Sequence, residues 1–293
     1  MAKQLAALAL LANAFAWGVS WWPFRALQGH GVHPLWATAL IYVTVLVGLL
    51  LMQPSSWRSF FHTPLLWALA LAAGLTNIGF NWAVTVGDVV RVVLLFYLMP
   101  AWVVLLAWPL LGERPSAGSL WRMALALLGV VIILKTPEAS WPWQHTLADW
   151  LALLAGLCFA LTNILLRKLK DAPPSACVLA MFSGGTVMAA TAAMVGMQWG
   201  VVGPLPGLAA HWLVWVGALS IMFLLGNLGL QYGAARLSAS TTSIIMLTEV
   251  IFASVSAVAL GAGEVTPQLL AGGACILLAS ILSILLPTKM AKP

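Results

Sequence analysis

Apolar stretches recur from one end of the chain to the other, and each is bounded by Pro, Gly, Trp or a charged residue. At about 20 residues each, they are long enough to cross the ~30 Å hydrocarbon core of a bilayer as helices. Of the 293 residues, 62% are apolar and only 7% are charged, whereas a soluble domain needs roughly 25% charged residues. The sequence therefore predicts a protein whose solvent is the lipid bilayer.

We expect an all-α integral membrane protein with ten transmembrane helices, because a lipid-exposed segment can satisfy its backbone polar groups only as a helix. The longest polar connectors, about residues 136–146 and 196–210, are too short to hold a separate soluble domain. The predicted spans are residues 5–26, 35–52, 64–85, 89–111, 119–135, 148–168, 175–197, 211–232, 238–261 and 267–286.

The basic residues are unevenly divided between the two sides of this topology. With the N-terminus in the cytoplasm, ten Lys and Arg residues fall on that side and three on the other, which agrees with the positive-inside rule. The net charge of +6 therefore reflects orientation, and no nucleic-acid partner is expected. We expect a multi-pass protein of a bacterial inner membrane with both termini cytoplasmic. The inner set is Lys3, Arg58, Arg114, Arg122, Arg167, Lys168, Lys170, Arg236, Lys289 and Lys292, and the outer set is Arg25, Arg91 and Lys135.

The sequence carries no motif for metal, nucleotide or covalent chemistry. Cys158, Cys177 and Cys275 are widely spaced inside apolar stretches, so neither a disulfide framework nor a thiolate metal site is indicated. The histidines lie mainly in connectors, and no Gly-Lys-Ser, His-Glu-x-x-His or Cys-x-x-Cys pattern occurs. The first apolar run continues to Phe24, which indicates an uncleaved helix rather than a signal peptide. We expect no enzyme activity, cofactor or metal.

The second half of the chain repeats the pattern of the first, with polar residues matching polar and aromatic matching aromatic ones. Each half holds five predicted helices, and because five is odd the second half must enter the membrane from the opposite side. We expect two five-helix repeats of inverted topology, residues 1–140 and 141–293, around a central cavity, as in many secondary transporters. The matching segments are residues 75–82 with 225–232, 111–114 with 262–265, and 120–134 with 271–285.

Several short motifs of the two halves also occur together in a known family. A Gly-Glu pair ends a span in each half, a glycine-containing last helix follows it, and a Leu-Thr-Glu-Val sequence is similar to a Leu-Glu-Pro-Val pattern. In these features the chain resembles the drug/metabolite transporter superfamily, and within it the ten-helix EamA type. The residues are Gly112-Glu113 and Gly263-Glu264, Gly129 and Gly272-Gly273, and Leu247-Thr248-Glu249-Val250. Val250 stands where that pattern has Pro, which leaves open whether the ninth helix is kinked.

A narrower resemblance comes from the run of residues 91–102 together with Ala16-Trp17-Gly18, which is similar to the YddG-like exporters of aromatic amino acids. It implies export of aromatic and hydrophobic amino acids and related small metabolites by alternating access. The cavity would be walled by helices 1, 3, 4, 6, 8 and 9, with helices 5 and 10 as peripheral supports.

Amide side chains occur at equivalent places in the third and eighth predicted helices. Asn77 and Asn81 share one helical face because they are four residues apart, and Asn227 and Gln231 repeat the arrangement. Amides inside a membrane must pair or face water. One interpretation is interhelical hydrogen bonding; the other is that both ladders line the cavity and contact a solute.

The fourth predicted helix carries Arg91, Leu95, Leu98 and Trp102 on one face. This arrangement favours a seat for an aromatic amino acid, with guanidinium against carboxylate and indole against ring. Snorkelling of Arg91 to the outer headgroups, or an ion pair with Asp88, is the alternative.

Trp17 and Glu249 are the other intramembrane candidates. Trp17 lies well inside its span and provides either a second ring for the solute or plain helix packing. Glu249 is predicted to lie deep in the ninth helix, where a carboxylate either couples protons, binds an amine or stabilises neighbouring groups. Pro23 and Pro100 are predicted hinges. The full set of candidate substrate-binding residues is Trp17, Asn77, Asn81, Arg91, Leu95, Tyr97, Leu98, Trp102, Asn163, Asn227, Gln231 and Thr242.

The sequence leaves several alternatives open. The solute could instead be a purine, a nucleotide-sugar-like compound or a drug, carried by an exporter or an exchanger, and a channel-like facilitator would also fit. The expected partners are a small-molecule substrate and the lipid bilayer. A monomer is favoured, and a dimer stays open.

Overall fold

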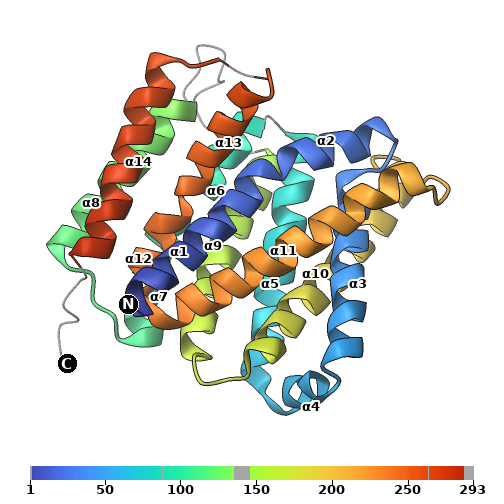
Figure 1. The fold of residues 1–293 in the computed structure, drawn as a ribbon, viewed down its shortest axis with the longest axis horizontal. Helices are drawn as coiled ribbons and strands as arrows, with labels where there is room; N and C mark the ends of the chain where they lie inside the picture. Colours follow the sequence, from blue (N-terminus) through green and yellow to red (C-terminus); the bar gives the residue numbers. More distant parts are fainter. Residues whose placement is uncertain (1, 88, 135–145, 263, 287–293) are drawn as a thin grey trace.

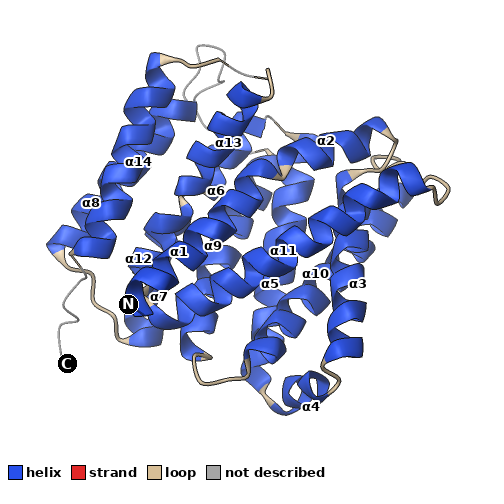
Figure 2. Cartoon of the chain, viewed as in Figure 1, coloured by secondary structure: helices blue, strands red, loops and turns tan. Residues whose placement is uncertain are grey.

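The computed structural model describes residues 2–87, 89–134, 146–262 and 264–286, and within them every regular element is an α-helix (Figures 1 and 2). The helices run side by side or cross at moderate angles, and short loops join them. In chain order they are α1 (Ala2–Val19), α2 (Trp21–Gly29), α3 (Pro34–Met52), α4 (Ser55–His62), α5 (Pro64–Val86), α6 (Val89–Phe96), α7 (Met99–Leu111), α8 (Ala117–Leu134), α9 (Leu147–Lys168), α10 (Pro174–Gln198), α11 (Ala210–Arg236), α12 (Ala239–Met246), α13 (Thr248–Ala259) and α14 (Pro267–Leu285).

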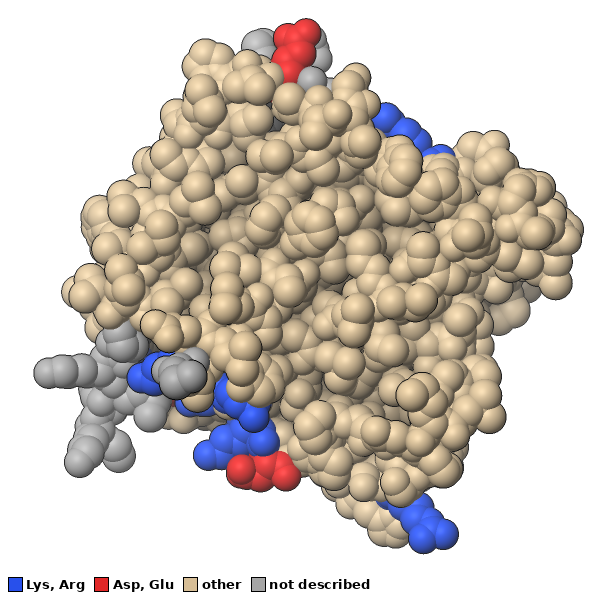
Figure 3. Space-filling view, viewed as in Figure 1, with Lys and Arg blue, Asp and Glu red and all other residues tan. Residues whose placement is uncertain are grey.

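The helices group into ten membrane crossings. Within the described residues, eight helical segments are long and apolar enough to span a bilayer, counting α1–α2 and α12–α13 as one segment each. The broken pair α6–α7 and the shorter α8 provide the other two crossings. In Figure 3 a broad belt without charged side chains lies between charged residues at two opposite edges of the molecule. We call the edge where α1 begins and α7, α9 and α11 end the N-terminal face.

Every predicted span is confirmed as helix, and most of the predicted ends lie within three residues of the observed helix ends. Three spans that were predicted as single helices are interrupted instead, as described below. The short helix α4 was not predicted, because its eight residues are too few for a span and its apolar residues Trp57, Phe60 and Phe61 are interleaved with polar ones.

The interruptions in the first half precede prolines. A proline lacks an N–H, and its ring clashes with the carbonyl four residues earlier. Helix α1 ends at Val19, four residues before Pro23, and α6 ends at Phe96, four residues before Pro100.

The interruption between α12 and α13 has a different cause, since Val250 can donate its N–H. The Thr248 hydroxyl donates to the Ile245 carbonyl at 2.7 Å, and Val250 N donates to the Leu247 carbonyl at 3.2 Å. A side-chain hydroxyl that competes for a helical carbonyl loosens the turn. The ninth crossing is therefore broken without a proline, at the position equivalent to the break in the fourth.

The two halves interlock across the middle of the molecule. Helix α1 packs against α11 and α5 against α9, so the first crossing of each half lies along the third crossing of the other. Helices α3 and α10 pair in the same way, while α8 and α14 lie together at one side (Figure 1). Each pairing is thus the same when the two halves are exchanged, which is the arrangement expected of two inverted five-helix repeats.

Glycines permit the closest of these approaches. A Cβ on Gly184 of α10 would collide with the carbonyl of Ala70 on α5, and a Cβ on the adjacent Gly185 would overlap the ring of Tyr42 on α3. In the peripheral pair, a Cβ on Gly129 would stand 2.5 Å from the Gly272 carbonyl. The pair at residues 184–185 fixes both the position of α5 and that of the Tyr42 ring.

Candidate functional site

A cavity lies midway through the helices, at the level where the fourth and ninth crossings are broken. Its free volume in this conformation is about 60 Å³, which is below the ~300–1,000 Å³ usual for small-molecule sites, so a bound solute requires the cavity to widen. Helices α8 and α14 contribute no residue to it. Its lining consists of Trp17, Tyr42, Ala73, Thr76, Asn77, Phe80, Asn81, Phe96, Phe159, Thr162, Met181, Asn227, Leu230, Met246 and Glu249.

Aromatic lining residues from five helices form two walls of the cavity, one of them backed by Phe223 of α11. On one side Trp17 stacks on Phe223 with ring centroids 4.2 Å apart, and the Tyr42 ring meets the same Phe223 edge-on. On the other side Phe96 lies between Phe80, at 4.9 Å, and Phe159, at 5.8 Å. A flat apolar group of a solute would find ring faces and edges on both walls.

The asparagines of the two halves have the same local geometry. Asn77 Nδ2 donates to the Ala73 carbonyl and Asn227 Nδ2 to the Phe223 carbonyl, both at 2.8 Å and both four residues back. The Asn77 oxygen also accepts a hydrogen bond from the Tyr42 hydroxyl at 3.0 Å. Because each amide donates to its own helix, its carbonyl oxygen is the group that it can present to a solute.

Asn81 connects the third crossing to the second through a different bond. Its Nδ2 donates to the Thr38 hydroxyl of α3 at 2.7 Å, and Asn81 also lines the cavity. The two interpretations of the amide ladder are therefore not exclusive. The same side chains join α5 to α3 and face the cavity.

Glu249 is the only carboxylate among the described lining residues. It lies in the first turn of α13, where the helix dipole favours negative charge, and the Tyr97 hydroxyl donates a hydrogen bond to it. Gly18 lets α1 pass close to this turn, because a Cβ there would stand 2.7 Å from the Glu249 carbonyl. The Glu249 carboxyl group therefore lies between the break in the fourth crossing, where Tyr97 is, and the break in the ninth crossing.

Five of the predicted site residues line the cavity, namely Trp17, Asn77, Asn81, Asn227 and Glu249. Three others, Asn163, Gln231 and Thr242, are buried but lie outside the lining. Each is one helical turn from a lining residue, on the same helical face.

The predicted face of the fourth crossing is divided by the break at residues 97–98. Phe96 lines the cavity, while Leu95 packs against the cluster around Ala152, and Leu98 is partly buried outside the lining. Trp102 packs with Val103, Ala107, Ala160, Ile164 and Ala239, away from the cavity. The Arg91 side chain, like Asp88, lies outside the part of the chain that is described.

Sequence reasoning missed most of the aromatic lining. Phe80 could have been found, because it lies three residues after Asn77 and therefore on the same face. Tyr42, Phe96 and Phe159 gave no comparable signal, since a lone aromatic residue in an apolar span is usually packed against lipid or a neighbouring helix. Helices α3 and α10, the second and seventh crossings, were not expected to contribute, yet they provide Tyr42 and Met181.

The comparisons with known proteins agree with this architecture. A solved crystal structure that is 16% identical in sequence covers 99% of this chain and 100% of its own, with a TM-score of 0.81, and so shows the fold alone. None of the curated proteins matches the sequence. Residues 4–135 and 146–285 each match the EamA-like transporter family, one match for each half. Since the two matches cover nearly the whole chain, this multi-pass membrane protein belongs to the EamA-like transporter family, whose members carry small molecules.

Proposed function

We propose that the protein exports aromatic and other hydrophobic amino acids, and related small metabolites, by alternating access. The observation that carries the proposal is the pairing of two aromatic clusters with Glu249, the one carboxyl group among the described residues that line the cavity. Rings on both sides suit a flat apolar side chain, and Glu249 suits the ammonium group of an amino acid. Arg91, the third residue of α6, is the proposed partner of the solute carboxylate.

The broken crossings support alternating access as the mechanism. Discontinuous helices beside a midplane site are a common feature of inverted-repeat transporters. Here the breaks at residues 97–98 and at Leu247 lie next to the lining residues Phe96 and Met246, one in each half. Rotation about these breaks, with Pro23 and Pro100 as hinges, would expose the same site to one side and then the other. We further propose a bacterial inner membrane with both termini in the cytoplasm.

The test is transport by the pure protein in liposomes loaded with one unlabelled amino acid of a panel. Labelled phenylalanine, tyrosine or tryptophan should accumulate transiently by counterflow and its uptake should saturate, whereas alanine and aspartate should not compete. A flux that never saturates and shows no counterflow would favour a channel-like facilitator. Counterflow of a purine alone would replace the amino acid as the substrate.

Trp17 and Trp102 should behave differently in this assay. Trp17→Ala removes a ring of the cavity wall, and ring stacking is worth about 0.5–1.5 kcal/mol, so the apparent KM for phenylalanine should rise roughly 2- to 10-fold. Trp102→Ala should mainly lower the thermal unfolding midpoint, because Trp102 packs in an apolar cluster. Equal changes in KM for both variants would contradict this placement of the solute.

Energy coupling through Glu249 is a separate part of the proposal. If this carboxyl exchanges a proton with each cycle, an imposed pH gradient should drive net uptake of phenylalanine, and Glu249→Gln should remove that response. Exchange of solute for solute needs no net proton movement and serves as the reference measurement. A wild-type protein that ignores the gradient excludes the coupling role.

A further inference from the structure

Four buried polar side chains form a second layer beneath the cavity, toward the N-terminal face. They are Asn13, Asn163, Gln231 and Thr242, from α1, α9, α11 and α12, and each is at most 4% exposed. These helices pack against one another in pairs, α1 with α11 and α12, and α9 with α11 and α12. We call these four residues the polar layer.

Each member of the polar layer lies four residues from a cavity residue on its own helix. Residues four apart share a helical face and are separated by about 6 Å along the axis. The cavity residues in the same order are Trp17, Phe159, Asn227 and Met246. Asn13 also contacts this upper level directly, because its Nδ2 donates to the Met246 sulfur at 3.7 Å.

The hydrogen-bonding capacity of the polar layer is largely unused. Both amide atoms of Asn163, the amide oxygen of Asn13 and the hydroxyl of Thr242 are buried without a hydrogen-bond partner in the part of the chain that is described. Unpaired polar groups inside a membrane protein are costly. Apolar side chains of the same size would pack there at lower cost, so stability does not explain these residues.

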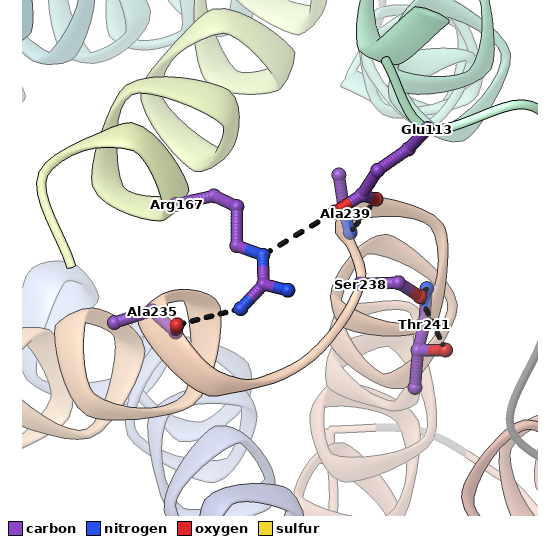
Figure 4. Close-up of polar contacts among 6 residues, drawn as sticks. All are labelled: Glu113, Arg167, Ala235, Ser238, Ala239 and Thr241. Carbon is purple, nitrogen blue, oxygen red and sulfur yellow. Dashed lines mark hydrogen bonds and ion pairs between the residues drawn. The ribbon is translucent and has the colours of Figure 1, made fainter. Parts of the chain in front are cut away.

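About one helical turn closer to the N-terminal face, the ends of α9 and α11 and the start of α12 take part in a set of polar contacts (Figure 4). Arg167 Nε donates to Glu113 Oε1 at 3.3 Å, and Arg167 Nη1 donates to the Ala235 carbonyl at 2.7 Å. The other oxygen of Glu113 accepts from the Ala239 N–H at 3.1 Å. We call these four residues the latch. Arg167 and Ala235 lie four residues beyond Asn163 and Gln231, and Ala239 lies three before Thr242.

The latch ties the two halves together at the N-terminal face. Glu113 comes from the first half and the other three residues come from the second. The equivalent position on the opposite face is Glu264, which is exposed, and no ion pair joins it to any described residue. The N-terminal face is therefore held closed by these contacts in this conformation.

We propose that the polar layer is a transit site for the polar end of the solute on its path between the cavity and the N-terminal face, and that the latch is the gate of this path. The proposal rests on the transport function proposed above. In the closed state the amide of Asn163, the amide oxygen of Asn13 and the hydroxyl of Thr242 are unpaired among the described residues, and they pair with the ammonium or carboxylate of the solute, or with water, when the latch opens. An apolar seam could not pass a zwitterion.

Thiol accessibility tests the path without requiring any transport. In a protein whose three native cysteines are replaced by alanine, Asn163→Cys is exposed to a membrane-impermeant methanethiosulfonate from the N-terminal side of sealed vesicles. Arg167→Ala should raise the labelling rate about tenfold, because labelling follows the population of the open state. Arg114→Ala removes a neighbouring cation that stacks on Trp108 outside the latch, and should leave the rate unchanged.

Leu165→Cys controls for general loosening, because Leu165 is equally buried on α9 but lies on the opposite helical face. An unchanged rate at position 163, or an equal rise at position 165, overturns the proposal. Failure of amino acid transport would refute the proposed function and leave this measurement intact.

A second variant separates transit from packing. Asn163→Leu keeps the side-chain size and removes the unpaired amide, so it should raise the thermal midpoint while lowering the transport rate at least tenfold for whichever solute is carried. A stabilised protein with wild-type transport would show that the solute does not pass the polar layer.

Discussion

Replacing Glu249 by glutamine is expected to weaken phenylalanine binding by about 30-fold in the purified protein. Glutamine keeps the shape and a hydrogen-bond acceptor for Tyr97, but it removes the only carboxyl group among the described cavity residues, the one that would pair with the solute ammonium. Loss of one partner from a buried charge pair costs about 2–5 kcal/mol, and the lower end applies because the acceptor is retained. About 2 kcal/mol corresponds to the 30-fold change.

Two analogues of phenylalanine test whether the lost affinity comes from the contact between Glu249 and the ammonium group. Phenethylamine, which has the ring and the amine alone, should lose affinity in Glu249→Gln as phenylalanine does. 3-Phenylpropionate, which lacks the amine, should bind the variant as well as or better than the wild type. Glu264→Gln is the matched control, since Glu264 is exposed and is not a lining residue of the cavity. Equal losses for all three compounds would place the ammonium elsewhere.

Gly184→Ala is expected to have the largest effect on stability of any single methyl group added to the protein. The new Cβ would overlap the Ala70 carbonyl of α5. A side chain could avoid such an overlap by changing its rotamer, but a backbone carbonyl can move only if the helix itself shifts. Overpacking typically costs about 1–3 kcal/mol, and this case belongs at the upper end. Because α5 provides Asn77, Phe80 and Asn81, a shift of this helix should also lower transport.

Gly217→Ala is the control for that experiment. Gly217 lies in α11 with no atom near its would-be Cβ, and alanine favours a helix more than glycine does. The thermal midpoint in detergent should fall strongly for Gly184→Ala and stay level or rise for Gly217→Ala. A wild-type midpoint for Gly184→Ala would mean that α5 and α10 are less closely packed than described.

The sequence predicted the crossings well because the cost of lipid-exposed backbone acts locally, on each span separately. Apolar length alone placed α3, α9 and α14 within one residue at each end. The breaks were harder to predict. Those before Pro23 and Pro100 have a sequence signal, whereas the break at Leu247 depends on Thr248 bonding to a carbonyl, which a serine or threonine in an apolar span does only in some contexts.

The site was only partly predictable, because a cavity is made by helices that are distant in the chain. Polarity identified Asn77, Asn227 and Glu249, since an amide or a carboxylate within an apolar span demands an explanation. Depth in the span did not separate Trp17 from Trp102. That distinction arises only after the break at residues 97–98 has set the direction in which the second of these rings points.

The two breaks beside the cavity differ in what can undo them. A pyrrolidine ring is covalent, so the missing donor at Pro100 is the same in every state that the chain visits. The Thr248 hydroxyl is held only by a hydrogen bond, which can break when the helices move, so the backbone of that turn can then close into continuous helix. The break in the first half is therefore set by the covalent structure, whereas the break in the second half depends on a hydrogen bond that can be lost.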